Sequence, residues 1–130
     1  MDIMDINELT IGQAKELAAL FSSNQAHKES LATQFIGQKV IVRTFSAGVW
    51  FGELSEKSGN EVILFNARRM WRWQAAKSIS LSAVAVHGID ASKSKIAPAV
   101  DNIWLEAIEI IPASAAAIKS IEGAKDVEAE

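Results

Sequence analysis

The chain has 130 residues, of which 49% are apolar, so one compact domain with its own hydrophobic core is expected. It contains no cysteine, which excludes disulfide bonds and thiolate metal sites and fits a reducing cytoplasm. The N-terminal sequence lacks the basic and apolar regions of a signal peptide, and no window holds the ~18 uninterrupted apolar residues that a membrane span needs. We therefore expect a cytoplasmic protein with no membrane partner.

The charges are unevenly distributed along the chain. The net charge is −3, which argues against non-specific binding of duplex nucleic acid, because phosphate backbones require a basic surface. From Val62 to Ile89 there is no Asp or Glu, and the four cations in this stretch give it a formal charge of +4. This asymmetry predicts a local anion-binding site. The alternative is a solvated basic strand edge that deters edge pairing.

The first expected element is a helix from Thr10 to Phe21. Thr10 is a good N-cap, Gln13 stands at the capping-box position, and apolar residues then recur at helical spacing. The polar run from Ser22 to Ser30 indicates a linker. We therefore divide the chain into an N-terminal helical arm (1–22), a linker (23–35), a core domain (36–123) and an acidic tail (124–130).

Short strands joined by glycine-bearing turns are expected after the linker, because β-branched and aromatic residues are concentrated there. The expected strands are Lys39 to Thr44, Val49 to Leu54, Glu61 to Phe65 and, after a break at Asn66 and Ala67, Arg68 to Trp73. Their number and spacing predict an antiparallel meander or a small, partly closed barrel.

The second half of the chain contributes a mixture of elements. Ser80 to His87 fits a short helix that Gly88 stops, although its composition leaves a strand open. We expect an exposed loop at Ala91 to Ala99, a strand at Val100 to Ile111, a helix at Ser114 to Glu122 and a mobile charged tail from Ala124 to Glu130. The predicted fold class is α+β: a meander or partly closed barrel with an N-terminal, a short middle and a C-terminal helix.

The segment NARRMWRW, Asn66 to Trp73, is the strongest candidate for a binding site. If it is extended, Arg69, Trp71 and Trp73 share one face, and Arg68, Met70 and Arg72 share the other. Guanidinium groups bind phosphate oxygens in bidentate geometry, and an indole offers a flat surface for a base. Three of the four arginines of the chain lie within these eight residues, which predicts a site for an anionic, nucleotide-like ligand.

A structural role for the same residues stays open. The tryptophans could belong to the core, and arginine stems could cover them by cation–π packing. Arg43, on the first strand, could join the site or lie on the surface. The candidate ligand-binding residues are therefore Arg43, Asn66, Arg68, Arg69, Trp71, Arg72 and Trp73.

Nothing in the sequence predicts catalysis. His87 has no motif that supplies a nucleophile or an orienting carboxylate, and His27 has no partner at metal-ligand spacing. Nucleotide-binding and hydrolase motifs of the glycine-rich kind are absent from the sequence. We expect a non-catalytic protein without a cofactor or a metal.

Three segments, VIVRTFSAGVWFG, NEVILFNARRMWRW and LEAIEIIP, resemble a widespread family of small phage and prophage proteins. That family is similar in character to the Thoeris anti-defence sponges, which sequester cyclic ADP-ribose-type immune signals. The resemblance implies a homo-oligomer, in an infected host cell, that binds a cyclic nucleotide through Arg68, Arg69 and Trp71. A virion or assembly protein that acts through subunit contacts is the alternative. A regulator that binds single-stranded nucleic acid is a third possibility, which the net acidity disfavours.

Overall fold

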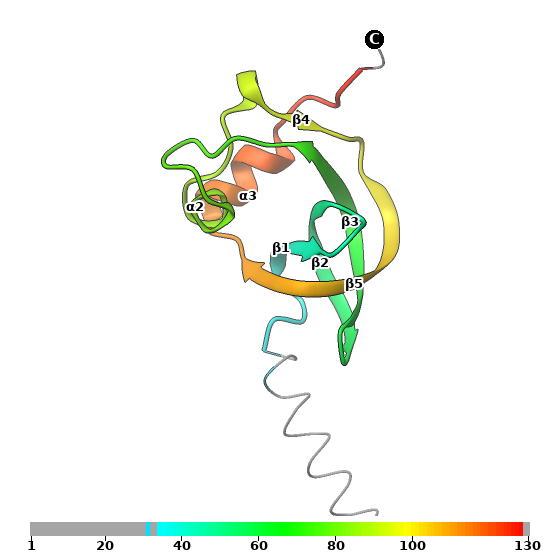
Figure 1. The fold of residues 1–130 in the computed structure, drawn as a ribbon. Coiled ribbons are helices and arrows are strands. Elements are labelled where there is room, and N and C mark those ends of the chain that lie inside the picture. Colours follow the sequence, from blue (N-terminus) through cyan, green and yellow to red (C-terminus); the bar gives the residue numbers. More distant parts are fainter. Residues whose placement is uncertain (1–30, 32–33, 129–130) are drawn as a thin grey trace, which may run out of the picture. The chain divides into compact units, whose positions relative to one another are not determined.

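The computed structural model describes residues 31 and 34–128, and the compact unit that carries the fold begins at Phe35 (Figure 1). An antiparallel sheet forms most of it, and a single-turn 3-10 helix, η1, precedes the shortest strand. The strands are β1 (Lys39–Thr44), β2 (Val49–Ser58), β3 (Glu61–Arg72), β4 (Lys95–Ile96) and β5 (Val100–Pro112), and the helices are α2 (Leu81–His87), η1 (Ala91–Lys93) and α3 (Ala115–Glu122). No described helix has the length and apolar character needed to cross a membrane.

Four strands pair in a closed circuit. β1 pairs with β2, β2 with β3, β3 with β5, and β5 with β1, and the short β4 adds to the C-terminal end of β3. Irregular register between β2 and β3 lets these long strands bend, because an extra residue on one strand increases its local coiling. One such bulge places Asn66 in a left-handed conformation, with φ 49°, opposite Gly52. A Cβ at Gly52 would lie 3.0 Å from the carbonyl oxygen of Phe65, so the close approach of the strands requires glycine there.

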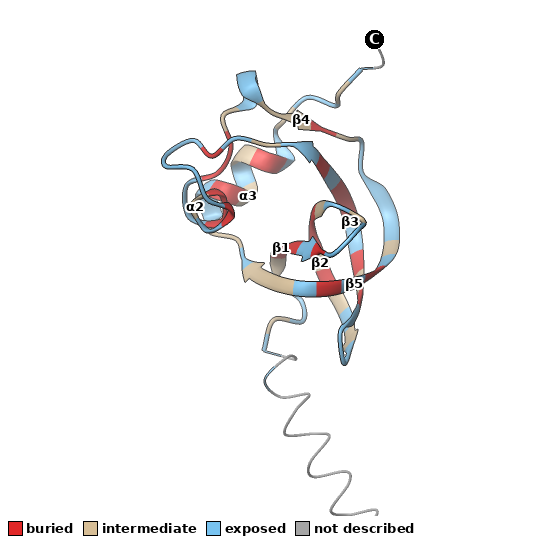
Figure 2. Cartoon of the chain, in the orientation of Figure 1, coloured by how far each residue is buried: buried red, intermediate tan, exposed pale blue. Residues whose placement is uncertain are grey.

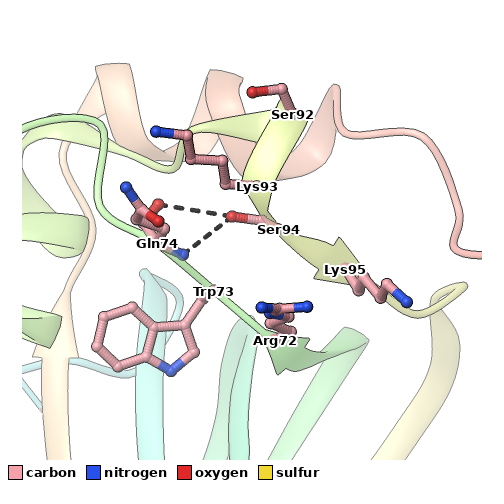
Figure 3. A pocket seen from close by; sticks show the side chains of 7 residues that line it. All are labelled: Arg72, Trp73, Gln74, Ser92, Lys93, Ser94 and Lys95. Atoms are coloured by element: carbon pink, nitrogen blue, oxygen red, sulfur yellow. Dashed lines mark hydrogen bonds between the residues drawn. The ribbon is translucent and has the colours of Figure 1, made fainter.

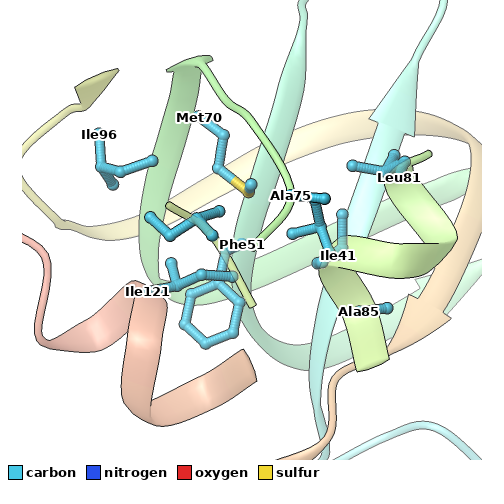
Figure 4. Close-up of a cluster of buried hydrophobic side chains, with 10 residues drawn as sticks. Ile41, Phe51, Met70, Ala75, Leu81, Ala85, Ile96 and Ile121 are labelled. Carbon is cyan, nitrogen blue, oxygen red and sulfur yellow. The ribbon is translucent and has the colours of Figure 1, made fainter. Parts of the chain in front are cut away.

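The sheet buries apolar side chains on both of its surfaces. Val40 and Val42 of β1 belong to an inner cluster enclosed by the circuit of strands, whereas Ile41 belongs to an outer cluster under the helices. Figure 4 shows this outer cluster, in which Phe51 lies near Ile121 of α3, and Figure 2 shows buried residues along both the strands and the two helices. The helices therefore cover part of the outer surface of the sheet.

The α+β class predicted from the sequence is wrong. The described chain is mostly an antiparallel sheet, and its two short helices, α2 and α3, occur only after the three strands that open the fold. The strand content exceeds the prediction partly because the predicted third and fourth strands are one strand, β3, which continues through the bulge at Asn66. The predicted helix from Thr10 to Phe21 and nearly all of the linker lie outside the described residues.

The ambiguous segment from Ser80 to His87 is a helix. The hydroxyl of Ser80 accepts a hydrogen bond from the amide of Ala83, and Gly88 follows the last turn with φ 86°. The C-terminal segment, predicted to be a charged tail, contacts the fold through a backbone hydrogen bond. The amide of Val127 donates to the carbonyl of Ile96 at 2.8 Å, which holds the segment against β4.

Candidate functional site

Arg68 is buried, with 6% of its surface exposed, and its guanidinium binds the protein itself. Nη1 donates to the carbonyl oxygens of Ile121 and Ala124, both at 2.8 Å. Nε donates to the carbonyl of Ala97 at 2.9 Å, and Nη2 donates to the carboxylate of Asp126 at 2.7 Å. These bonds tie the end of α3 and the residue that follows β4 to β3. The role of Arg68 is therefore structural, and the predicted contact with a ligand does not fit its geometry.

Arg69 and Trp71 lie on one side of β3 and reach solvent, as the predicted alternation requires. The guanidinium carbon of Arg69 stands 4.6 Å from the centre of the Trp50 ring, which it covers. Trp71 is 66% exposed, and the ammonium of Lys95 lies 5.3 Å from the centre of its ring. Trp73 does not share this side, because the register shift between Met70 and Arg72 in the β3–β4 pairing turns it toward the outer cluster.

Arg43 and Asn66 do not join the other candidates. The Nε of Arg43 pairs with the carboxylate of Glu109 at 3.2 Å, across the β1–β5 pairing. Asn66 is exposed and serves the backbone, because asparagine tolerates the left-handed conformation that the bulge imposes.

An open hollow of about 400 Å³ lies where β3 ends beside η1 and β4 (Figure 3). Two of the predicted residues, Arg72 and Trp73, contribute to it, and Arg72 is paired in register with Lys95 of β4. The hollow is lined by Arg72, Trp73, Gln74, Ser92, Lys93, Ser94 and Lys95. Three of these side chains are cationic and none is acidic.

Backbone and hydroxyl hydrogen bonds hold the two walls of the hollow together. The amide of Gln74 donates to the Oγ of Ser94 at 3.0 Å (Figure 3). The carbonyl of Gln74 accepts from the amide of Asp90 at 2.8 Å. The carboxylate of Asp90 caps η1, because it accepts from the amide of Ser92 at 3.1 Å and from its hydroxyl at 2.6 Å. Together these bonds fix the segment that carries Lys93 and Lys95 opposite the end of β3.

The electrostatics of the hollow favour an anion. The hydroxyl of Ser92, hydrogen-bonded to Asp90, holds the pKa of that carboxyl below its usual value, so Asp90 stays ionised and engaged with the loop. Arg72 offers a fork of donors that matches phosphate, and Lys93 and Lys95 add point charges. Among residues 31 and 34–128, no three histidine, aspartate or glutamate side chains lie together in a group that could hold a metal ion.

Sequence reasoning missed most of the lining residues. Ala91 to Ala99 was expected to be an exposed loop, and Gln74 was not considered. The alternation of serine and lysine from Ser92 to Lys95 was the available signal, because it places two cations and two hydroxyl groups within four residues. Only the pairing of β4 with the end of β3 brings these lysines beside Arg72.

Fold and site together define a small β-rich domain with a basic hollow beside the C-terminal end of β3. The chain belongs to the family described as a domain of unknown function (DUF6948), whose sequence profile matches residues 37–121. The match covers every residue that lines the hollow and carries no link to phages or to anti-defence sponges. No curated protein and no solved structure matches the chain.

Proposed function

We propose that this chain is a non-catalytic binding protein for a small phosphorylated ligand, held in the hollow between the end of β3 and the segment from Ser92 to Lys95. The observation that supports this proposal is that three cationic residues and no carboxylate line one hollow. A volume of about 400 Å³ is in the range of small-molecule sites. Arg72 binds a phosphate through its fork, and Lys93 and Lys95 neutralise the remaining charge.

The proposed ligand is a nucleotide, because an exposed indole borders the cations. Lys95 lines the hollow and also lies over the ring of Trp71, so the indole stands beside the hollow's rim. A base can stack on the open face of Trp71 while its phosphate enters the hollow. Such stacking contributes ~1–3 kcal/mol per base.

The specific form of the proposal is sequestration of a cyclic nucleotide immune signal, such as a cyclic ADP-ribose isomer or a cyclic oligonucleotide. Its support is the resemblance of the three sequence segments to small phage proteins. A protein of this kind needs affinity and no chemistry, because it lowers the free signal by mass action according to its dissociation constant and copy number. In this form the protein counters host anti-phage defence in the infected cell.

The test is a thermal-shift screen followed by calorimetric titration. The probes are cyclic ADP-ribose isomers, cyclic dinucleotides, cyclic trinucleotides and short oligonucleotides. A ligand that binds the folded state raises the melting temperature, and ~100 times its Kd adds about 2.7 kcal/mol of stability. We expect Arg72→Gln and Lys93→Gln to abolish the shift, whereas Lys119→Gln, on the exposed surface of α3, leaves it intact.

Two outcomes contradict the proposal. No shift with any probe at a millimolar concentration excludes cyclic nucleotides and short oligonucleotides as the ligand. A shift that survives the double change of Arg72 and Lys93 places the ligand elsewhere. Stabilisation by oligonucleotides alone would favour a protein that binds single-stranded nucleic acid.

A virion or assembly role is the second candidate, and one observation favours it. Trp104 and Phe65 are 55% and 42% exposed on the outer surface of the sheet. Exposed aromatic side chains of this size are typical of protein interfaces. This candidate predicts subunit contacts that do not depend on a small ligand.

A further inference from the structure

The outer surface of the sheet that the helices leave open carries three cross-strand rows of side chains. The register of β2, β3 and β5 sets each row. The rows are Glu53, Phe65 and Asn102; Glu56, Ile63 and Trp104; and Ser58, Glu61 and Glu106. Because cross-strand partners point to the same side of a sheet, these nine side chains form one surface, here called the acidic face.

The acidic face combines aromatic area with carboxylates, and at its edge Lys39 of β1 pairs in register with Glu53. Within the described part of the chain, Glu53, Glu56, Glu61 and Glu106 form no ion pair. Glu61 and Glu106 stand directly opposite each other, which is destabilising for like charges, and Glu61 accepts one hydrogen bond at 3.1 Å from the indole of Trp104. An incoming cation would relieve this repulsion.

The same chain carries a complementary surface, here called the basic end. It consists of Arg69, Trp71, Arg72 and Lys95. Arg69 pairs in register with Trp50 of the inner cluster, whereas Phe65 belongs to the outer surface. The basic end and the acidic face therefore lie on opposite sides of β3. One copy can present both surfaces at once to two neighbours.

We propose that the acidic face binds the basic end of a second copy of this chain. The cations of the basic end meet the carboxylates, and the indole of Trp71 packs against Trp104 and Phe65. The contact is head-to-tail, because it joins two different surfaces. A second acidic face would repel the first. Residues 1–30 carry five carboxylates against two lysines, so their net charge does not complement the acidic face either. The contact goes beyond the proposed function and does not require a ligand.

Charge reversal in the full-length chain tests the contact. One variant, Glu61→Lys with Glu106→Lys, makes the acidic face basic, and the other, Arg69→Glu, makes the basic end acidic. We expect the wild type to self-associate at ~100 µM, and each variant alone to do so at least ~10-fold more weakly, measured by sedimentation velocity. An equimolar mixture of the two variants should regain association, because the intact basic end of the first meets the intact acidic face of the second and the two reversed surfaces are also complementary.

The wild-type contact should also weaken between ~0.1 and ~1 M salt, because the Debye length falls from ~10 to ~3 Å. Trp104→Ser serves as a second variant, since its exposed side chain contributes little to folding, and it should weaken association as the reversals do. A monomeric wild type overturns the proposal, whether the acidic face is then covered by residues 1–30 or by another protein. Association that both reversals leave unchanged also overturns it.

This test is separate from that of the hollow. Neither Glu61 nor Glu106 lines the hollow, so their reversal should leave nucleotide binding intact while it removes self-association. Because the contact covers Trp71, Arg72 and Lys95, which also belong to the proposed ligand site, nucleotide binding is measured in the Glu61→Lys, Glu106→Lys variant, and its failure there contradicts the proposed function alone. Failure of association in a wild type that binds nucleotide contradicts only the contact proposed here.

Discussion

Arg68 and Arg72 lie on one strand, four residues apart, and have opposite environments. Arg68 is buried and donates four hydrogen bonds to the protein, whereas Arg72 is exposed and lines the hollow. In a regular strand both would point to the same side. The register shift after Met70 breaks that alternation, so side-chain chemistry alone does not decide which arginine is available to a ligand.

The largest effect is expected at Arg68. Replacement by methionine removes the arginine donor from three carbonyl groups inside the fold, so Arg68→Met should lower the free energy of unfolding by about 3 kcal/mol, measured by urea denaturation. Asp126→Asn is the control, because that carboxylate is exposed and its loss should cost less than about 1 kcal/mol. Equal losses from the two changes would mean that the ion pair, and not the carbonyl contacts, gives Arg68 its role.

Replacement of each arginine by lysine sharpens the same comparison. Lysine keeps the charge but lacks the planar fork, so it cannot reach all the partners of Arg68 at once. We expect Arg68→Lys to cost about 2 kcal/mol of stability and Arg72→Lys less than about 0.5 kcal/mol, by the same measurement. Arg72→Lys should instead weaken nucleotide binding about 10-fold. A stability loss at Arg72 as large as that at Arg68 would contradict the distinction drawn between them.

Substitutions of Asn66, in the bulge through which β3 continues, should have a smaller effect on stability. Asn66 has φ 49°, which a β-branched residue adopts only with strain, so Asn66→Val should lower stability by about 1 kcal/mol in thermal or urea unfolding. Asn66→Gly should remain within about 0.5 kcal/mol of the wild type, because glycine reaches this conformation readily. If valine is tolerated as well as glycine, the left-handed geometry is not what the position requires.

The smallest effect concerns pH. The hydrogen bond from Ser92 lowers the pKa of Asp90 below its ordinary value of 3.8. A lowered folded-state pKa means that the carboxylate stabilises the loop at neutral pH, and this contribution is lost as the pH falls below 3.8 through the folded-state pKa. Ser92→Ala should raise the pKa of Asp90 toward 3.8 in an NMR titration of its side-chain carboxyl carbon. An unchanged titration would show that Ser92 does not set this pKa.

The sequence by itself determined the local elements where a short-range signal exists. The strand from Lys39 to Thr44 occurs as predicted, because its alternating β-branched residues need no distant partner to be recognised. Ser80 and Ser114 were identified as helix caps, and both hydroxyls accept the expected amide hydrogen bonds. The sequence also predicted the basic and aromatic character of the C-terminal end of β3.

Only the tertiary structure decided the fold class and the role of each candidate residue. Closure of the strand circuit depends on the pairing of β1 with β5, which is distant in sequence, and the continuity of β3 depends on a bulge that a break in the pattern had concealed. Arg68 became structural because carbonyl groups more than 25 residues away converge on it. Lys93 and Lys95 gained a shared hollow with Arg72 because β4 pairs with β3. The physical reason is the same in each case: such contacts join segments whose proximity the fold creates, and no local pattern encodes it.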